Sequence, residues 1–168
     1  MIPRRERPAF DAFVTASSDR LVRTAYLLSG DRGHAEDLVQ VALMRTARHW
    51  RRARESPQAY ARQVVVNLAK DRWRGLSRRP AELPLEVDIA APNTERLLDR
   101  DLLLRAVRQL PEGQRAVLVL RYFDDLSIDD TASALGCTTG TVKSQTARAL
   151  GNLRAALAST RGHANADR

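Results

Sequence analysis

The chain has 168 residues, of which 43% are apolar and only 5% aromatic, and its formal charge is +8. No apolar run approaches the about 20 residues that a membrane-spanning helix requires, so we expect a cytoplasmic protein with no membrane insertion. The single cysteine, Cys137, excludes an intramolecular disulfide. The three histidines are scattered, and no glycine-rich phosphate loop follows a strand. We therefore expect no metal site, no cofactor and no enzymatic activity.

Positive charge is concentrated in the first half of the chain. Residues 1–80 carry 17 basic and 8 acidic side chains, whereas residues 81–100 carry 2 and 5. All but two of the 28 basic residues are arginine, whose planar guanidinium suits phosphates and base edges. A basic segment of this kind favours a nucleic-acid partner.

The apolar pattern predicts helices throughout and almost no strand. Apolar residues recur at spacings of three and four, and Pro80, Pro84 and Pro92 interrupt the pattern among acidic residues. The predicted helices cover residues 8–28, 35–50, 56–73, 94–110, 113–122, 127–135 and 139–157. We therefore predict an all-α fold of two small helical domains joined by a flexible linker. The expected boundaries are 1–78, a linker over 79–95, 96–158, and a disordered tail over 159–168.

The most specific local pattern lies in residues 127–157. Ser127 and Asp130 resemble a capping box, and Gly136 can end the short helix that they begin. A tight turn and a second helix follow, which is the helix-turn-helix arrangement of DNA-binding proteins. The polar side of the second helix carries the candidate duplex-reading residues Lys143, Ser144, Gln145 and Arg148. An ordinary amphipathic helix at the end of a bundle is the alternative interpretation.

The helix predicted from residue 56 has a narrow polar stripe. Its members follow helical spacing along one line, with Trp73 at the edge of the stripe: Gln63, Asn67, Lys70 and Arg74. An amide, two cations and an aromatic edge suit contact with a strand whose bases are partly unstacked. Two alternatives stay open, because the stripe is also typical of a solvated basic face and Trp73 of a core residue.

The second predicted helix has apolar residues on its outward side. That side carries Asp37, Gln40, Val41, Met44 and Arg48. An exposed valine and methionine between charged residues indicate a protein-binding face, although Met44 could also pack against the linker.

Four ordered motifs resemble the extracytoplasmic-function (group 4) sigma factors of bacterial RNA polymerase. They are Ala-Glu-Asp-Leu-Val-Gln at 35–40, Val-Asn-Leu-Ala-Lys-Asp-Arg at 66–72, Leu-Pro-Glu-Gly-Gln-Arg at 110–115 and Gly-Thr-Val-Lys-Ser at 140–144. The stretches 25–31 and 143–145 look like the SigE-family branch common in actinobacteria. The resemblance runs from about residue 10 to residue 157.

The resemblance implies roles for both blocks. The first would be a sigma-2 domain, a bundle of three or four helices, in which the Asp37 helix docks on the β′ clamp helices of core polymerase and the Asn67 helix reads and melts the −10 element. The second would be a sigma-4 domain that reads the −35 element as duplex and docks on the β flap. Core RNA polymerase and promoter DNA are the implied partners, and an anti-sigma factor is a further candidate.

The sequence departs from the family pattern at three positions. Many relatives have glutamate where this chain has Val41, and basic residues are common where it has Gln145 and Leu150.

Two other classes of function also stay open. A helix-turn-helix repressor or activator would bind its operator without being a polymerase subunit, and a helical adaptor would bind protein only.

Overall fold

The structure is a computed structural model that describes residues 2–77 and 95–166. All regular elements within those residues are helical, which confirms the predicted fold class. The chain divides into two compact units, Met1–Glu82 and Leu83–Arg168, called here the N-terminal and C-terminal units. The predicted linker, residues 79–95, lies outside the described residues except for Glu95, where a helix begins.

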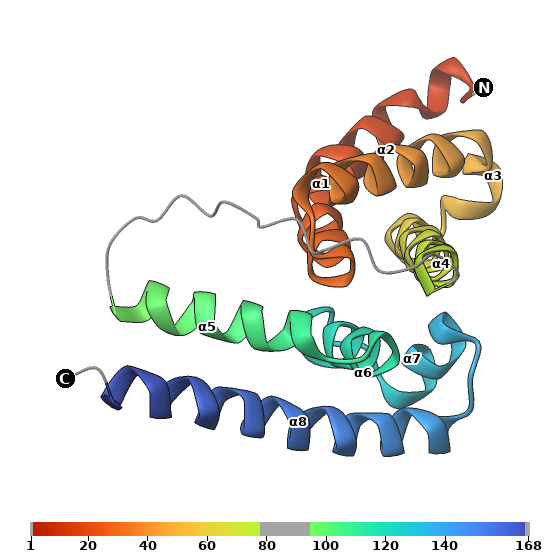
Figure 1. The fold of residues 1–168 in the computed structure, drawn as a ribbon. Coiled ribbons are helices and arrows are strands. Elements are labelled where there is room, and N and C mark those ends of the chain that lie inside the picture. Colours follow the sequence, from red (N-terminus) through yellow and green to blue (C-terminus); the bar gives the residue numbers. More distant parts are fainter. Residues whose placement is uncertain (1, 78–94, 167–168) are drawn as a thin grey trace. The chain divides into compact units, whose positions relative to one another are not determined.

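The N-terminal unit is built on three long helices that pack against one another (Figure 1). They are α1 (Arg7–Ser29), α2 (Arg32–Arg48) and α4 (Pro57–Ser77). A short turn of 3-10 helix, η1 (Arg4–Glu6), precedes α1, and the single-turn helix α3 (Trp50–Ala53) links α2 to α4. The sequence pattern predicted the three long helices but neither of the short ones, because a single turn is too short to show a period.

The turn between α1 and α2 follows from two residues. Gly30 ends α1 in the left-handed conformation with a φ of 75°, which costs glycine little because it lacks a Cβ atom. Asp31 then begins α2, and its Oδ1 accepts a hydrogen bond from His34 N at 2.7 Å. This bond lowers the pKa of the Asp31 carboxyl from its ordinary value, because it stabilises the carboxylate. The helix therefore begins three residues earlier than the predicted residue 35.

An aromatic cluster and a run of valines fill the core of the N-terminal unit. The rings of Phe10 and Trp50 meet edge to face at 5.2 Å, and Phe13 lies 6.1 Å from each of them. On α4, three successive residues, Val64, Val65 and Val66, are all buried. This helix is therefore enclosed over much of its circumference, and only a narrow side of it reaches solvent.

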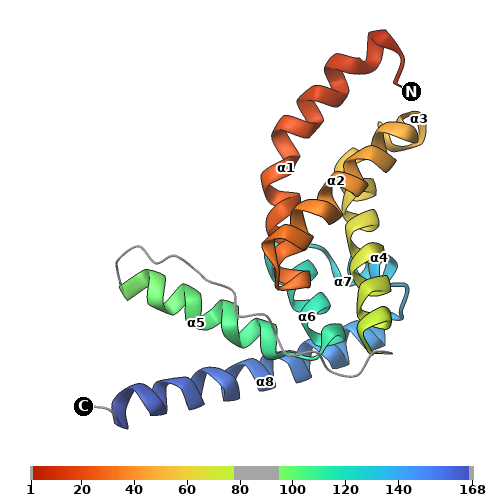
Figure 2. The ribbon, with the colours of Figure 1, turned by 45° about the horizontal axis from the view of Figure 1, so that its top comes forward.

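The C-terminal unit is arranged around its last helix, α8 (Thr139–Ala166). Three further helices contact it, and Figure 2 shows it passing along α5 and α6. These helices are α5 (Glu95–Gln109), α6 (Glu112–Leu118) and α7 (Ile128–Leu135), with the π-helical turn η2 (Val119–Phe123) extending α6. Two apolar clusters hold α8 in place, one around Leu118 and Ala149 and the other around Val117 and Val142.

The predicted helix-turn-helix is present in the C-terminal unit. Ser127 Oγ accepts a hydrogen bond from Asp130 N at 3.0 Å and donates one to Asp130 Oδ2 at 2.7 Å. Gly136 ends α7 with a φ of 64°, and Thr138 Oγ1 then accepts a hydrogen bond from Thr141 N in the first turn of α8. The capping residues therefore fix both the start and the end of the turn.

A half-buried arginine joins the end of α5 to α6. Arg115 Nη2 donates hydrogen bonds to the carbonyl oxygens of Arg108, at 2.7 Å, and Leu110, at 3.2 Å. These carbonyls lie at the C-terminus of α5, where they have no partner within the helix. Burial lowers the pKa of the Arg115 guanidinium from its ordinary value, although nearby Glu112 acts in the opposite direction.

Two helices extend beyond their predicted ends. The helix α4 continues four residues past Trp73 to Ser77, and α8 continues to Ala166 although residues 159–168 were expected to be disordered. The segment from Ala155 to Ala166 contains five alanines, the residue with the highest helix propensity, and no proline. Residues 159–166, which the sequence assigned to a disordered tail, are thus helical in the structure.

Candidate nucleic-acid and polymerase interface

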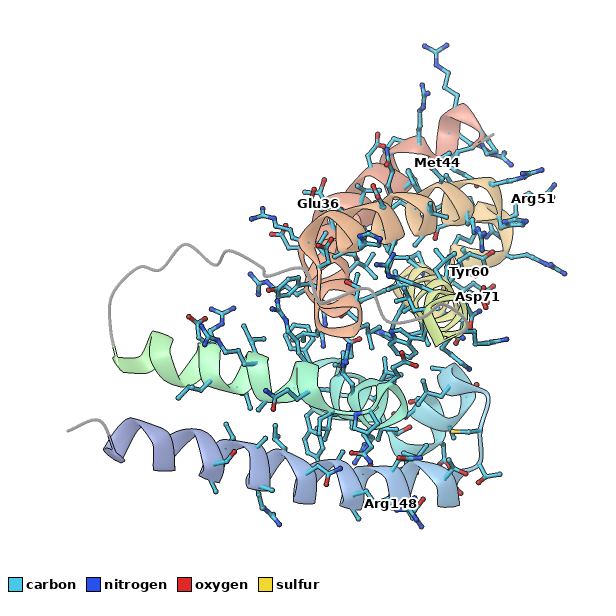
Figure 3. The ribbon with its side chains drawn as sticks, in the orientation of Figure 1. Glu36, Met44, Arg51, Tyr60, Asp71 and Arg148 are labelled. Atoms are coloured by element: carbon cyan, nitrogen blue, oxygen red, sulfur yellow. The ribbon has the colours of Figure 1, made fainter. Side chains whose placement is uncertain are left out.

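The outward side of α2 exposes all five residues that the sequence placed there. Met44 is 66% exposed and Val41 36%, and Figure 3 shows Met44 on the side of α2 away from α4. The opposite side of the helix is buried against α1 and α4 through Ala35, Val39, Ala42 and Thr46. Since these four residues fix the rotation of α2, the apolar side chains at 41 and 44 cannot turn into the core.

Polar and charged neighbours frame this apolar patch. Asp37, Gln40 and Arg48 are exposed on the same helix, and Arg32 Nε pairs with Glu36 Oε1 at 3.1 Å one turn closer to its start. An exposed apolar centre with a charged border is the composition of a protein-binding surface. The arrangement is suited to a partner that buries both Val41 and Met44.

The stripe on α4 lies along one side of the helix, and a hydrogen bond joins two of its residues. Gln63 Nε2 donates to Asn67 Oδ1 at 3.1 Å, so the two amides lie side by side along the helix. Asn67 and Arg74 are exposed, whereas Gln63 and Lys70 are half-buried, and Arg74 Nη2 lies 3.6 Å from Asp71 Oδ1. The stripe therefore presents a paired amide at its centre with cations on its C-terminal side.

Trp73 does not belong to this exposed surface. Its side chain is only 8% exposed and lies on the buried side of α4 with Val66, one helical repeat of seven residues away. Its assignment to the DNA-binding stripe is wrong on this geometry, and the core role that the sequence left open is the one observed. A stacking platform for an unpaired base therefore has to come from another residue.

The start of α8 presents exposed cations and a set of small residues. Lys143, Ser144 and Arg148 are exposed, and so are Ala147 and Gly151 on the same side. Ser144 Oγ donates a hydrogen bond to Thr141 O at 3.1 Å, so its donor is used within the helix. Small residues between the cations let the backbone of a helix approach a groove closely.

Gln145 is the exception on α8. Its side chain is half-buried, and its Nε2 lies 4.0 Å from the point that a Cβ atom on Gly113 of α6 would occupy. The structure therefore directs this amide towards α6. Lys143 and Arg148 are the predicted reading residues that extend fully from the surface.

A cavity lined by arginines lies elsewhere on the N-terminal unit, and the sequence analysis did not predict it. Its lining includes Arg5, Arg51 and Arg54. The available signal was the density of arginine at residues 4–7 and 51–54, which are far apart in the sequence.

Within 2–77 and 95–166, no helix combines the length and the apolar character needed to cross a membrane. The same residues contain no cluster of three or more histidine, cysteine or acidic side chains placed to hold a metal ion.

Both units match families of known proteins. Residues 13–79 match sigma-70 region 2, and residues 100–153 match sigma-70 region 4. The chain is 39% identical over 150 residues to the RNA polymerase sigma-E factor of Streptomyces coelicolor, covering 86% of this chain and 84% of that protein. It is 33% identical over 162 residues to the ECF sigma factor SigM of Mycobacterium tuberculosis, covering 95% of this chain and 81% of SigM.

Solved structures show the same fold. The sigma factor RpoE of Bartonella quintana, in complex with the anti-sigma factor NepR, gives a TM-score of 0.71 at 24% identity, covering 89% of this chain and 96% of RpoE. CnrH in complex with the cytosolic domain of CnrY gives a TM-score of 0.67 at 19% identity, covering 91% and 90%.

The different burial of Trp73 and Asn67 predicts opposite consequences of truncation. Trp73→Ala should lower the free energy of unfolding of the N-terminal unit by about 3 kcal/mol or more, because it leaves a large cavity in the core. Asn67→Ala should change it by less than about 0.5 kcal/mol, since it removes one exposed hydrogen bond. Urea denaturation of both variants, followed by circular dichroism, measures the difference. If the Trp73→Ala variant were as stable as the original chain, Trp73 would not be a core residue.

Proposed function

Since this chain belongs to the extracytoplasmic-function sigma factors, the subunits that direct bacterial RNA polymerase to its promoters, we propose that its two units divide promoter recognition between them. The N-terminal unit binds core polymerase through α2 and opens the −10 element with α4. The C-terminal unit reads the −35 element as duplex with α8. The observation that supports this division is that each unit exposes a polar helix face whose opposite side is fixed in the core.

The boundaries of the division are also part of the proposal. Residues 1–78 form the core-binding and −10 domain, residues 79–95 the linker, and residues 96–158 the −35 domain. The extension after 158 carries no assigned role. Sigma factors are regulatory subunits without a catalytic site, and we place this one with its polymerase in the cytoplasm.

The outward face of α2 is the proposed contact with the β′ clamp helices. Its apolar centre, Val41 and Met44, would be desolvated by the partner, while Asp37, Gln40 and Arg48 would form polar contacts around it. Many relatives carry a glutamate at the position of Val41, so this chain replaces a charged contact with an apolar one. Binding through this face should therefore depend less on salt than a contact made by a carboxylate.

The stripe on α4 is the proposed −10 surface. Asn67 presents both a donor and an acceptor in one side chain, which lets it contact the edge of an extruded base as lysine cannot. Lys70 and Arg74 are positioned to hold the strand through its phosphates, and Gln63 orients Asn67 through their hydrogen bond. The buried Trp73 contributes to this surface by fixing the rotation of α4.

On α8, Lys143 and Arg148 are the proposed contacts to the −35 element. Arg148 can fork onto a guanine in the major groove, and Lys143 can reach a phosphate or a base edge. Ser144 is left to accept hydrogen bonds or to make close contacts, because its donor is engaged with Thr141. The C-terminal unit would also provide the contact with the β flap, and an anti-sigma factor stays a predicted partner.

Transcription with purified components tests the proposed function. The chain, added to core polymerase that lacks any sigma subunit, should produce transcripts that begin at defined promoter positions. A helix-turn-helix repressor or activator is the alternative, and it would bind its operator duplex with no polymerase present. Duplex binding without polymerase, combined with the absence of specific transcripts, would support that alternative.

The apolar patch on α2 leads to a prediction about binding to core polymerase. Changing Val41 and Met44 together to serine should weaken core binding by at least about 2 kcal/mol, roughly 30-fold in Kd, because the patch forms the desolvated centre of the interface. Core binding in the absence of DNA can be measured by fluorescence anisotropy. Leu76→Ser, which alters another exposed apolar residue of the same unit, serves as the control and should bind normally. Unchanged affinity of the double variant, with helicity preserved, would contradict this assignment.

The cations on α8 lead to a prediction about binding to the upstream promoter element. Arg148→Ala should weaken binding to the upstream element by about 1 to 3 kcal/mol and relax the preference at one base pair. Binding to a set of promoters with single substitutions in this element measures both effects. Arg154→Ala, an exposed arginine further along the same helix, is the matched control. An equal loss on every promoter would make Arg148 a phosphate contact.

A further inference from the structure

A cavity of about 460 Å³ lies at the end of the N-terminal unit where η1 approaches α3. It is lined by Pro3, Arg5, Glu6, Arg51 and Arg54. We propose that this arginine cavity binds phosphate groups of promoter DNA, as a contact separate from the α4 stripe and from α8. The proposal rests on the promoter-binding function above and adds to it a site that lies on other elements.

The charge around the cavity is strongly positive. Residues 3–7 and 51–55 contain six arginines, at positions 4, 5, 7, 51, 52 and 54, and two acidic residues, Glu6 and Glu55. The fold brings together two basic segments that are more than 40 residues apart in the sequence. Guanidinium groups present paired donors that match phosphate oxygens, so a phosphate is the ligand that this lining favours.

The arginines of α3 are displayed from a fixed turn. Trp50 and Ala53 are only 4% and 2% exposed, so the helix is anchored on the residues between and beside the arginines. The ring of Trp50 lies edge to face against Phe10 of α1, at 5.2 Å, and α1 follows directly from η1. Arg51, labelled in Figure 3, projects from this anchored turn. The backbone on both sides of the cavity is therefore positioned before any ligand arrives.

These guanidinium groups are little used within the protein itself. The side chain of Arg54 is 58% exposed, and its Nη1 lies 3.9 Å from Glu6 Oε1, which is long for an ion pair. In residues 2–77 and 95–166, neither Arg5 nor Arg51 makes a side-chain hydrogen bond or ion pair. Their donors are therefore available to phosphate oxygens.

The carboxylate of Glu6 provides a second test, because its removal should affect a phosphate and a hydrogen-bond donor in opposite directions. Its side chain is 18% exposed, and its Oε2 is buried with no hydrogen-bond partner among the described residues. A carboxylate in this position repels a phosphate but would attract a ligand that donates hydrogen bonds. Glu6→Gln removes the charge with little change in shape, so it should strengthen phosphate binding and weaken the binding of a hydrogen-bond donor.

The main experiment measures how promoter binding by the complete holoenzyme depends on salt. Each phosphate that a protein neutralises contributes about 0.7 to 0.9 to the slope of log K against log salt concentration, for single-stranded and duplex DNA respectively. The triple variant Arg5→Ala, Arg51→Ala, Arg54→Ala should therefore have a slope that is smaller in magnitude by about 1 to 2. Glu6→Gln should bind promoter more tightly than the original chain at every salt concentration.

A second triple variant controls for the loss of net charge. Arg100, Arg105 and Arg154 are exposed in the C-terminal unit and have no role in the proposed surfaces. Their replacement by alanine removes the same charge and should leave the slope close to its original value. An unchanged slope in the cavity variant, an equal change in both triple variants, or weaker promoter binding by Glu6→Gln would each overturn the phosphate site. Failure of the proposed function would look different, because the original holoenzyme would then form no promoter complex to titrate.

Discussion

The burial of α4 is the constraint on which the N-terminal unit depends. Val64, Val65 and Val66 are all removed from solvent, and Trp73 closes the same core two turns later. Because successive residues on a helix point in directions about 100° apart, burying three in a row encloses most of the helix. The paired amides and the cations lie on the side that remains accessible to solvent, next to other exposed residues such as Asp71 and Leu76. The packing that stabilises the unit thus also orients its proposed −10 surface.

In the C-terminal unit, too, the buried side of a helix determines which of its side chains are exposed. Val142 and Ala149 are fully buried, so Lys143 and Arg148, each next to one of them in the sequence, are held on the outside of α8. Thr138 and Gly136 set the point at which this helix begins. Recognition surfaces that lie on well-packed helices are positioned more accurately than surfaces on loops. Each unit can therefore present its own surface without help from the other.

Much of this organisation could be predicted from the sequence, because its signals are local. Gly136 ended a helix as expected, Ser127 capped α7, and the exposed positions on α2 followed helical spacing. Burial at the border of a helix face could not be predicted in this way. Trp73 lies beside the stripe on a helical wheel, and its depth depends on how closely the neighbouring helices approach it.

The sequence pattern also could not predict contacts between segments that are distant in the sequence. The half-buried Gln145 of α8 lies beside Gly113 of α6, more than 30 residues away in the sequence. The two hydrogen bonds of Arg115 to α5 and the arginine cavity likewise join segments whose proximity no periodicity records. The ends of α4 and α8 were missed because both helices continue through a glycine, Gly75 and Gly162, a residue that often ends a helix.

The central claim is that the α4 stripe opens the promoter while α8 only holds it. Permanganate reactivity of unpaired thymines tests this claim most directly, in complexes that holoenzyme containing Asn67→Ala forms with duplex and with pre-melted promoters. The account predicts normal core binding, little thymine reactivity on the duplex promoter, and recovery of initiation, but not of base preference at one position, on the pre-melted one. If Asn67→Ala opens duplex promoters as the original chain does, with the same preference at every position of the −10 element, the stripe is a solvated basic face and the account is wrong.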